Sequence, residues 1–350
     1  MMSDKKTIKT IKFEDGSRYE GEVNESGQPH GKGHLVSNSP TGCGRKDHYQ
    51  GEFKNGKKDG YGHMKYELNG YIAEYKGEWH DDMRCGKGKY SRMSMGGGAR
   101  HCYEYDGEWL DDKEHGQGVS INSDEKGIHL STIMEKYTGG FANGQRHGHG
   151  KIERDGYDGN FSDGKEYFEG EFVEGKLSGH CVHTMVNGDI CEFQDGYCNG
   201  IGTYTFKNGV RFTALWQNGK LDFDTVEMEG DKSALLLWVS ESHHGFGCSE
   251  SLSCVMVAKK GMQRYNEAMI VINWDYHINS KDACLEITKV TDDSVTYVVK
   301  PYFLEGNDSI TDTIKRGERK DYKNEIEHTG RMYDEEFEYT SGSELLIICR

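Results

Sequence analysis

The stretch YQGEFKNGKKDGYG, residues 49–62, places the aromatic residues Tyr49 and Phe53 on either side of a Gly-Glu pair, and three spaced glycines follow. The same order of residues returns in YKGEWHDDMRCGKG from Tyr75 and in YDGEWLDDKEHGQG from Tyr105. Regular self-similarity of this kind indicates a repeat architecture, in which one short unit is stacked many times. We therefore expect this part of the chain to be built from repeats.

The repeat can be followed over roughly residues 7–222. An aromatic residue stands at position one, glycine at three, glutamate at four and a second aromatic residue at five, and glycine recurs at positions eight, twelve and fourteen. Asp82 and Asp112 replace the glycine of position eight in two copies. The copies begin at Tyr19, Tyr49, Tyr75, Tyr105, Tyr137 and Phe168, with a truncated copy from Tyr157, a degenerate copy over 189–202 and a shortened one from Phe212.

Each copy is expected to form one antiparallel β-hairpin of about 20 residues. Side chains alternate along a strand, so positions one, three and five share a face. The glycine at position three leaves a slot for an aromatic ring from a neighbouring strand. The segments NGK, DDM and ANG supply turn residues that tolerate positive φ. Because a single hairpin is only marginally stable, the copies must stack to bury a common aromatic row.

The segments between copies have their own turn signals. Asp15-Gly16 and Asn208-Gly209 predict hairpin turns between neighbouring repeats. TIKTIKF, residues 7–13, predicts a strand that covers the first end of the sheet. The extra residues of 36–47 and 91–104 fall between the second strand of one copy and the first of the next. They are expected to lengthen the hairpin ends along one edge of the sheet.

The repeated pattern resembles the MORN repeat, whose consensus is close to YEGEWxxGKxHGxG. The resemblance covers about three fifths of the chain and implies a long, curved, single-layered antiparallel sheet with a trough lined by aromatic residues. It also implies self-association and a position near membranes or the cytoskeleton. The repeats begin 30, 26, 30 and 32 residues apart from Tyr19 to Tyr137, whereas family repeats commonly recur every ~23 residues.

The aromatic row allows two interpretations. Its rings can pack against one another and against the glycines as the core of the sheet, and this interpretation carries most weight because a single sheet has no other core. Part of the row can also form a surface for a partner, since one layer cannot bury both of its faces. The candidate partner-binding residues are Tyr49, Phe53, Tyr75, Trp79, Tyr105, Trp109, Tyr137 and Phe141.

Polar residues at fixed repeat positions are expected to be structural. His30, His115 and His147 each precede a glycine, which favours a turn role such as a hydrogen bond to the backbone. A metal or catalytic site would need different residues converging on one point, so no catalytic residue, metal ligand or cofactor is assigned. The position-four glutamates are expected to pair with lysines on neighbouring strands; they are Glu22, Glu52, Glu78, Glu108 and Glu171.

Charge is spread unevenly along the chain, whose formal net charge is -16. Residues 1–100 hold 18 basic and 14 acidic side chains, whereas residues 101–250 hold 12 and 27. An acidic middle repels phosphate-rich ligands, so nucleic acid is not an expected partner. Any anionic membrane surface would bind through residues 1–100. Ten scattered cysteines with no CxxC pair are typical of reduced cytosolic thiols, so a cytoplasmic location is expected.

The last third of the chain has a different pattern. After about residue 230, apolar and β-branched runs are separated by polar turn segments such as TDD and EGND. About seven strands are expected, and no helical period occurs, so residues 231–350 predict a compact β-sandwich-like domain. The expected domains are a capping strand over 1–18, the repeat array over 19–222 and this β-rich domain.

The order of a MORN array and a β-rich domain resembles the layout of SET-domain lysine methyltransferases. That family binds its methyl donor through an N-H-S-x-x-P-N stretch. HINSKDACLE, residues 277–286, has Asn279-Ser280 but lacks the histidine between them, the proline and the second asparagine. HHGFG, residues 243–247, resembles that family's early glycine motif only weakly. An active methyltransferase is therefore disfavoured, and a decayed one stays an alternative.

The sequence thus predicts an all-β chain, with an elongated single-layer array of hairpins followed by a compact β-sandwich-like domain. The favoured function is a non-enzymatic scaffold that binds partner proteins, with a second copy of the chain as a further expected partner. The alternatives are a SET-type protein lysine methyltransferase and peripheral attachment to anionic membrane phospholipid through residues 1–100.

Overall fold

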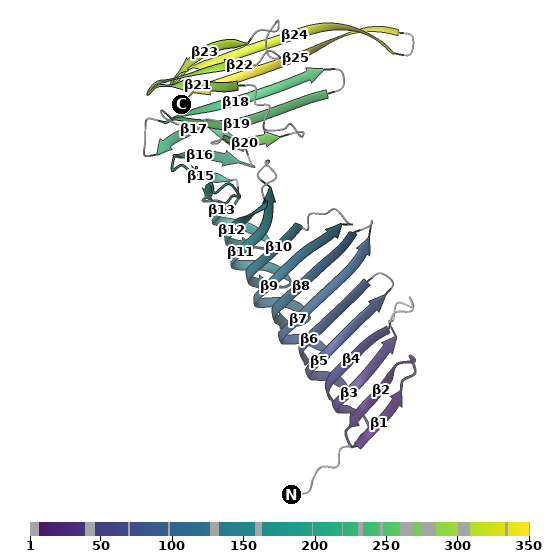
Figure 1. The fold of residues 1–350 in the computed structure, drawn as a ribbon. Coiled ribbons are helices and arrows are strands. Elements are labelled where there is room, and N and C mark those ends of the chain that lie inside the picture. The colour runs from purple at the N-terminus through teal and green to yellow at the C-terminus, as the bar shows by residue number, and fades with distance from the viewer. Residues whose placement is uncertain are drawn as a thin grey trace. The chain divides into compact units, whose positions relative to one another are not determined.

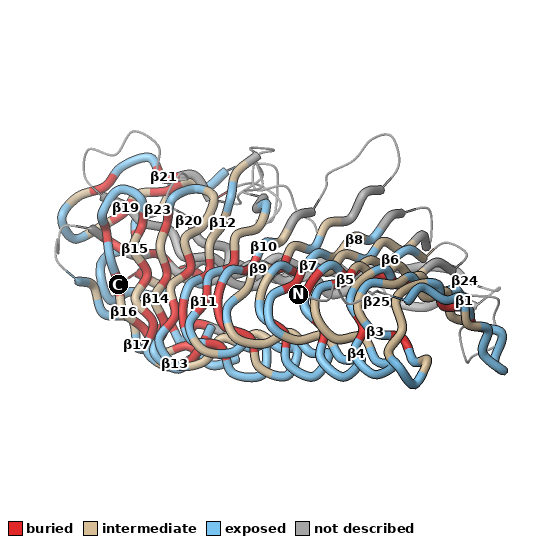
Figure 2. Tube along the Cα trace, turned by 90° about the horizontal axis from the view of Figure 1, so that it is seen from below, coloured by how far each residue is buried: buried red, intermediate tan, exposed pale blue. Residues whose placement is uncertain are grey.

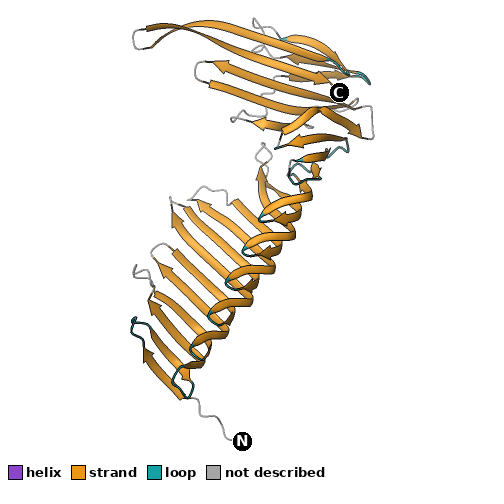
Figure 3. Cartoon of the chain, turned by 180° about the vertical axis from the view of Figure 1, so that it is seen from behind, coloured by secondary structure: helices purple, strands orange, loops and turns teal. Residues whose placement is uncertain are grey.

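All described secondary structure in the protein is β-strand. The computed structural model describes residues 7–38, 46–68, 71–96, 99–126, 133–157, 163–197, 199–218, 220–229, 234–245, 248–259, 269–274, 285–299, 309–332 and 335–349. These ranges contain strands and turns but no helix (Figure 3). Strands β1 to β17 belong to one sheet, and a five-stranded and a three-stranded sheet follow (Figure 1). The all-β fold class and the antiparallel hairpin array are therefore confirmed.

The chain divides into two compact units, one of residues 1–156 and 165–178 and the other of residues 157–164 and 179–350. The strands up to the end of the first unit are β1 (Thr7–Lys12), β2 (Arg18–Val23), β3 (Pro29–Asn38), β4 (Lys46–Lys54), β5 (Lys57–Leu68), β6 (Tyr71–His80), β7 (Met83–Gly96), β8 (Ala99–Leu110), β9 (Lys113–Lys126), β10 (Ile133–Ala142), β11 (Gln145–Tyr157) and β12 (Asp163–Val173).

The second unit continues the hairpins and then changes character. Its repeat strands are β13 (Lys176–Thr184), which begins in the first unit, β14 (Ile190–Phe193), β15 (Gly200–Thr205), β16 (Arg211–Gln217) and β17 (Lys220–Glu229). The strands of the two smaller sheets are β18 (Ala234–Gly245), β19 (Cys248–Lys259), β20 (Met269–Trp274), β21 (Leu285–Val290), β22 (Ser294–Val299), β23 (Ile310–Lys315), β24 (Arg319–Met332) and β25 (Glu335–Cys349).

Each repeat forms a hairpin whose turn is fixed by backbone conformation. In the copy from Tyr49, strands β4 and β5 pair antiparallel up to Lys54 and Lys57. The two turn residues between them, Asn55 and Gly56, have φ angles of 50° and 86°. Two consecutive positive φ angles define the tight hairpin turn that matches strand twist. The predicted turn segments are confirmed, and the pair Asp81-Asp82 adopts the same conformation without any glycine.

A bulge follows the turn in the hairpins that begin at Tyr19, Tyr49, Tyr75, Tyr105 and Tyr137, and the sequence pattern does not predict it. Gly51 faces Gly62 while Phe53 faces Lys58, so the register shifts within one repeat. Strand β5 has two more residues than β4 over this interval, and Gly60, at position twelve, lies among the residues left unpaired with β4, with a φ of 106°. Glu52 at position four folds over Gly60, where an added Cβ would lie 2.1 Å from its Oε2 atom. Gly60 is thus required both by conformation and by space.

The turns between repeats form as predicted. Asp15-Gly16 lies between β1 and β2, and Asn208-Gly209 lies between β15 and β16. The amide of Ser17 donates to Asp15 Oδ1, and the amide of Val210 donates to Asn208 Oδ1. The long segments between repeats lengthen the strands: β7 and β8 stay paired as far as Gly96 and Ala99. Residues 39–45 of the first long segment lie outside the described ranges.

The two smaller sheets pack around one apolar core, as expected of a sandwich-like arrangement. The five-stranded sheet has the order β20-β19-β18-β25-β24, and the three-stranded sheet has the order β21-β22-β23. Leu235, Leu237 and Ile347 of the first sheet join Val295 and Tyr297 of the second in one buried cluster. Two of the expected strands, EFEYT and ELLIICR, are parts of the single strand β25. The polar strands β23 and β24 were not predicted.

Candidate interaction surface

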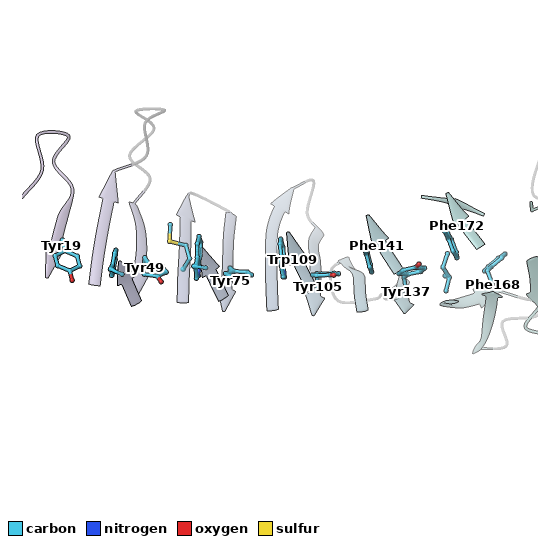
Figure 4. Close-up of a cluster of buried hydrophobic side chains, with 13 residues drawn as sticks. Tyr19, Tyr49, Tyr75, Tyr105, Trp109, Tyr137, Phe141, Phe168 and Phe172 are labelled. Atoms are coloured by element: carbon cyan, nitrogen blue, oxygen red, sulfur yellow. The ribbon is translucent and has the colours of Figure 1, made fainter. Parts of the chain in front are cut away.

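Aromatic rings on one face of the repeat sheet form a continuous buried row in the first unit (Figure 4). Tyr75 packs edge-to-face against Trp79 of its own repeat and against Trp109 of the next, with both pairs of ring centroids 5.2 Å apart. Each position-one tyrosine from Tyr49 to Tyr137 has the same two contacts. We call this row the aromatic ladder; it consists of Tyr19, Tyr49, Phe53, Tyr75, Trp79, Tyr105, Trp109, Tyr137, Phe141 and Phe172.

Glycines provide the seat on which each tyrosine of the ladder lies. A Cβ atom added to Gly51 would lie 2.5 Å from Tyr49 Oη, and one added to Gly62 would lie 2.3 Å from it. The slot is therefore filled by the tyrosine two residues earlier on the same strand, which corrects the expectation of a ring from a neighbouring strand. The Tyr49 hydroxyl reaches across the glycine and donates to the carbonyl oxygen of Glu52 at 3.0 Å.

Burial also fixes the ionisation state of the ladder. Desolvation raises the pKa of the Tyr49, Tyr75 and Tyr105 hydroxyls well above the ordinary tyrosine value, and it raises the pKa of Tyr137 to about 12. A hydroxyl that stays protonated remains a hydrogen-bond donor to the backbone. These groups therefore serve the fold at physiological pH, and their donors are committed to carbonyl oxygens of their own repeats.

All eight candidate partner-binding residues lie within this ladder. Their side chains are between 0% and 6% exposed, and the buried positions recur along the strands of the sheet (Figure 2). In the chain itself they pack as a core, which agrees with the first of the two interpretations. That a partner contacts this row stays a prediction for Tyr49, Phe53, Tyr75, Trp79, Tyr105, Trp109, Tyr137 and Phe141.

Charged side chains at position ten cover the ladder. Lys58 Nζ lies 5.0 Å from the ring centroid of Trp79, and Arg84 Cζ lies 4.3 Å from that of Trp109. Arg146 Cζ lies 4.9 Å from the ring centroid of Tyr137. A cation over an aromatic face is attracted by the ring quadrupole, so these residues stabilise the ladder on the side that faces away from the backbone.

Glu114 occupies the same position in the repeat from Tyr105 and reverses the charge. Its carboxylate accepts a hydrogen bond of 2.6 Å from the Tyr103 hydroxyl. Burial raises the pKa of Glu114 above the ordinary value, against the opposing effects of the Tyr103 hydrogen bond and the charges of Arg84, Arg92 and Arg146. This residue is the one carboxylate among the position-ten side chains of the copies from Tyr49 to Tyr137.

The opposite face of the sheet is polar and exposed. Glu74 lies within ion-pair distance of His63, Lys65 and Lys76, and Lys89 pairs with Glu104 at 3.2 Å. Burial opposes the ionisation of Glu74, but hydrogen bonds from His63 and Lys65 outweigh it, and the pKa of Glu74 falls below the ordinary value. We call this face, which carries repeat positions two, four, thirteen and fifteen, the outer face.

The position-four glutamates bind backbone rather than lysine in two repeats. The amide of Lys87 donates to Glu78 Oε1 at 3.0 Å, and the amide of Gln117 donates to Glu108 Oε1 at 3.3 Å. Both amides follow the bulge glycine. The expected glutamate–lysine pairing is thus wrong for Glu78 and Glu108, because each carboxylate instead accepts from a backbone amide that the bulge leaves outside the strand ladder.

Two of the repeated histidines take part in hydrogen bonds of the repeat hairpins. His30 Nδ1 accepts a hydrogen bond of 3.4 Å from the amide of the turn residue Asn55, which confirms a backbone role for this histidine. His115 contributes its carbonyl oxygen, which accepts from the Tyr105 hydroxyl. Within the described ranges no group of three or more His, Cys, Asp or Glu side chains has an arrangement that could hold a metal ion.

Most residues of the two segments compared with methyltransferase motifs lie outside the described ranges. Residues 277–284 and 246–247 lie outside the described residues, and 243–245 form the end of strand β18. The methyltransferase alternative therefore stays a prediction. No helix that could cross a membrane occurs in the described part of the chain.

A family model described as MORN repeat matches residues 19–39, 49–67, 75–93, 105–124, 137–154, 168–190 and 192–211. Six of these segments begin at the residues expected from the sequence pattern. The copy expected from Phe212 is unmatched, although β16 and β17 form its hairpin with Asn218 at a φ of 50°. The truncated copy from Tyr157 is unmatched as well. A search of curated proteins found no match.

Proposed function

Since the chain is a MORN-repeat protein, we propose that it is a non-enzymatic cytoplasmic scaffold that binds partner proteins through its repeat sheet and its C-terminal β-domain. MORN repeats generally serve as interaction modules. The proposal rests on the contrast between constant and variable positions in the repeats. The rings and glycines of each copy are committed to the aromatic ladder, while the side chains that cover the ladder and those of the outer face differ from copy to copy. A constant core with variable faces suits recognition.

Affinity capture from cell extract, followed by reconstitution with purified components, tests this function. We expect at least one captured protein to bind the purified full chain again with a Kd of about 10 μM or tighter, the range of transient to stable interfaces. Light scattering on the purified chain tests the expected self-association. A chain that remains monomeric and yields no protein that binds again would overturn the proposal.

A second candidate function is attachment to an anionic membrane through residues 1–100. One observation favours it: the outer face of strands β3 to β7 carries the exposed lysines Lys32, Lys76, Lys87 and Lys89, of which Lys76 and Lys89 also pair with Glu74 and Glu104. Basic side chains that share one face are attracted to acidic lipid headgroups, each by about 1 kcal/mol near the surface.

Sedimentation with vesicles tests this second candidate. We expect the chain to sediment with vesicles that contain phosphatidylserine and to stay in solution with purely phosphatidylcholine vesicles. Binding should weaken between low and high salt, because screening shortens the reach of surface charge. Salt-independent binding, or equal binding to both kinds of vesicle, would contradict it.

A further inference from the structure

Four side chains form a half-open cluster beside the aromatic ladder. Tyr71 lies on β6, Tyr90 and Arg92 on β7, and Tyr103 on β8. Tyr90 lies opposite Tyr105 of the ladder, and Arg92 lies opposite Tyr103 one pair further along the same face. Tyr90 and Tyr103 are only partly buried where they pack against the ladder. We call Tyr71, Tyr90, Arg92 and Tyr103 the tyrosine–arginine patch.

The members of the patch hold one another in place. The hydroxyl oxygens of Tyr71 and Tyr90 are 3.3 Å apart, and the ring centroids of Tyr90 and Tyr103 are 6.4 Å apart. Arg92 Cζ lies 5.2 Å from the ring centroid of Tyr103. The ring quadrupole attracts the guanidinium and so holds it beside Tyr103. The patch is therefore ordered before any partner arrives.

Arg92 differs from the other arginines of this face in its pairing. Arg84 pairs with Asp112, Arg146 with Glu135 and Arg154 with Glu166. Arg92 is exposed, and no carboxylate of the described residues lies within 4.0 Å of its nitrogens. The nearby carboxylate of Glu114 is already hydrogen-bonded by Tyr103. Arg92 therefore presents an ordered cation on a surface of tyrosine rings, within electrostatic reach of Glu114 but not in an ion pair with a carboxylate of the described residues.

The composition of the patch is that of an interface centre. Tyrosine, tryptophan and arginine carry most of the binding energy in protein interfaces. Arginine pairs with carboxylates through two parallel N–H···O bonds. Tyr71 and Tyr103 lie outside the residues that match the MORN repeat, which end at 67, resume at 75, end at 93 and resume at 105. The patch therefore combines Tyr90 and Arg92 of a matched repeat with two tyrosines from the lengthened strands between repeats.

We infer that the tyrosine–arginine patch is the anchor for an extended segment of a partner protein that carries a carboxylate side chain. The carboxylate binds the guanidinium of Arg92, and the paired hydroxyls of Tyr71 and Tyr90 hydrogen-bond the backbone of the segment. Neighbouring apolar groups of the segment lie on the rings. This inference rests on the proposed scaffold function and adds to it a site and the charge of the partner.

Fluorescence anisotropy with a labelled random copolymer of glutamate and tyrosine tests the inference on the full chain. The variant is Arg92→Gln, and the matched control is Lys89→Gln. Lys89 lies on the same strand three residues away, but it projects from the outer face, where it pairs with Glu104. Both variants lose one positive charge at an exposed position, so thermal unfolding should show both folded.

We expect the unsubstituted chain to bind the acidic copolymer. Arg92→Gln should weaken binding about tenfold, the loss of roughly one charge-assisted pair, and Lys89→Gln should change it less than twofold. Absence of binding, equal effects of the two variants, or equal binding of a lysine–tyrosine copolymer would each overturn the inference. If Arg92→Gln still captures the same protein from extract as the unsubstituted chain, the patch is wrong and the scaffold function stands.

Discussion

Two glycines in one hairpin meet different physical requirements. An added Cβ at Gly51 would lie 2.5 Å from the Cα of Gly62 and from the Tyr49 hydroxyl, so the requirement there is space. Gly56 has a φ of 86° and nothing within 4 Å of an added Cβ, so the requirement there is backbone conformation. Both positions are simply glycine in the sequence pattern, and only the structure shows that one requires space and the other a positive φ.

Replacing each glycine by alanine should distinguish these causes. Gly51→Ala overpacks the seat of Tyr49 and should lower the free energy of unfolding by about 1–3 kcal/mol. Gly56→Ala should cost about 1 kcal/mol. Gly56→Asn should cost less than Gly56→Ala, because asparagine tolerates positive φ. Urea unfolding of the three variants measures these values, and an equal loss for Gly51→Ala and Gly56→Ala would contradict the steric cause.

Glu114 should give the chain a measurable pH dependence. Its pKa is raised in the folded state, so the folded chain binds this proton more tightly than the unfolded chain does. The resulting contribution to stability is present at low pH and is lost as pH rises from the ordinary glutamate value through the raised value. Glu114→Gln keeps an acceptor for Tyr103 and removes the titration.

Thermal unfolding between pH 4 and pH 8 checks this expectation. The melting temperature of the unsubstituted chain should fall relative to that of Glu114→Gln as pH rises. Exposed Glu104→Gln on the outer face serves as the control for loss of one charge. Parallel curves for the unsubstituted chain and Glu114→Gln would show that burial does not govern this carboxylate.

Turns form the most regular element of the first unit. In five successive hairpins the amide of a turn residue donates to a carbonyl of the preceding repeat, as from Asp82 to Lys58 and from Asp112 to Arg84. Where aspartate replaces glycine, its carboxylate adds a bond: Asp112 Oδ1 accepts from the amide and the Nε of Arg84, each at 3.0 Å. The extra acceptor offsets the strain of a φ of 64° at Asp112.

Asp112 should therefore tolerate asparagine better than alanine. Asp112→Ala loses the acceptor and keeps the positive φ, and it should lower the free energy of unfolding by about 1–2 kcal/mol. Asp112→Asn keeps an acceptor and a side chain suited to this conformation, so it should cost less than half as much. Urea unfolding compares them, and equal losses would show that the hydrogen bonds to Arg84 contribute nothing.

The sequence predicted elements where residue type and conformation are tightly linked. Hairpins, turns and the aromatic face followed from glycine and aromatic spacing. The bulge in the repeat hairpins was not predicted because a glycine at position twelve is equally compatible with a regular strand. Strand β24 was not predicted because its sequence, RKDYKNEIEHTGRM, lacks the alternating apolar residues of a typical strand. Its backbone hydrogen bonds to β25 hold it in the sheet. The tyrosine–arginine patch was missed because Tyr71 and Tyr103 fall between repeats.

Stability of the first unit should be cooperative across neighbouring repeats. Each repeat contacts mainly the next, so the ladder residues between two copies carry their coupling. Trp109 joins the repeats that begin at Tyr75 and Tyr105, and its Nε1 donates to the carbonyl of Gly88 at 3.0 Å. Removing that ring should weaken the link between the two repeats more than it alters either hairpin.

Trp109→Ala should lower the free energy of unfolding by about 3–5 kcal/mol. Hydrogen exchange should accelerate in strands on both sides of the substitution, β6 to β9, before it does in β2 to β4. The neighbouring change Leu110→Ala is the control, because Leu110 is 49% exposed and should change exchange little. Uniform acceleration throughout the first unit would indicate one indivisible folding unit.

The reversed charge at position ten affects how a bound segment would align with the repeats. Identical copies would let a bound segment slide by one unit at no cost. A segment whose acidic group meets the cation of Arg84 would meet the anion of Glu114 if it were displaced by one copy. Like charges repel, so the displaced alignment is penalised and one alignment is preferred. The reversed charge of Glu114 thus makes one copy of the surface distinguishable from its neighbours.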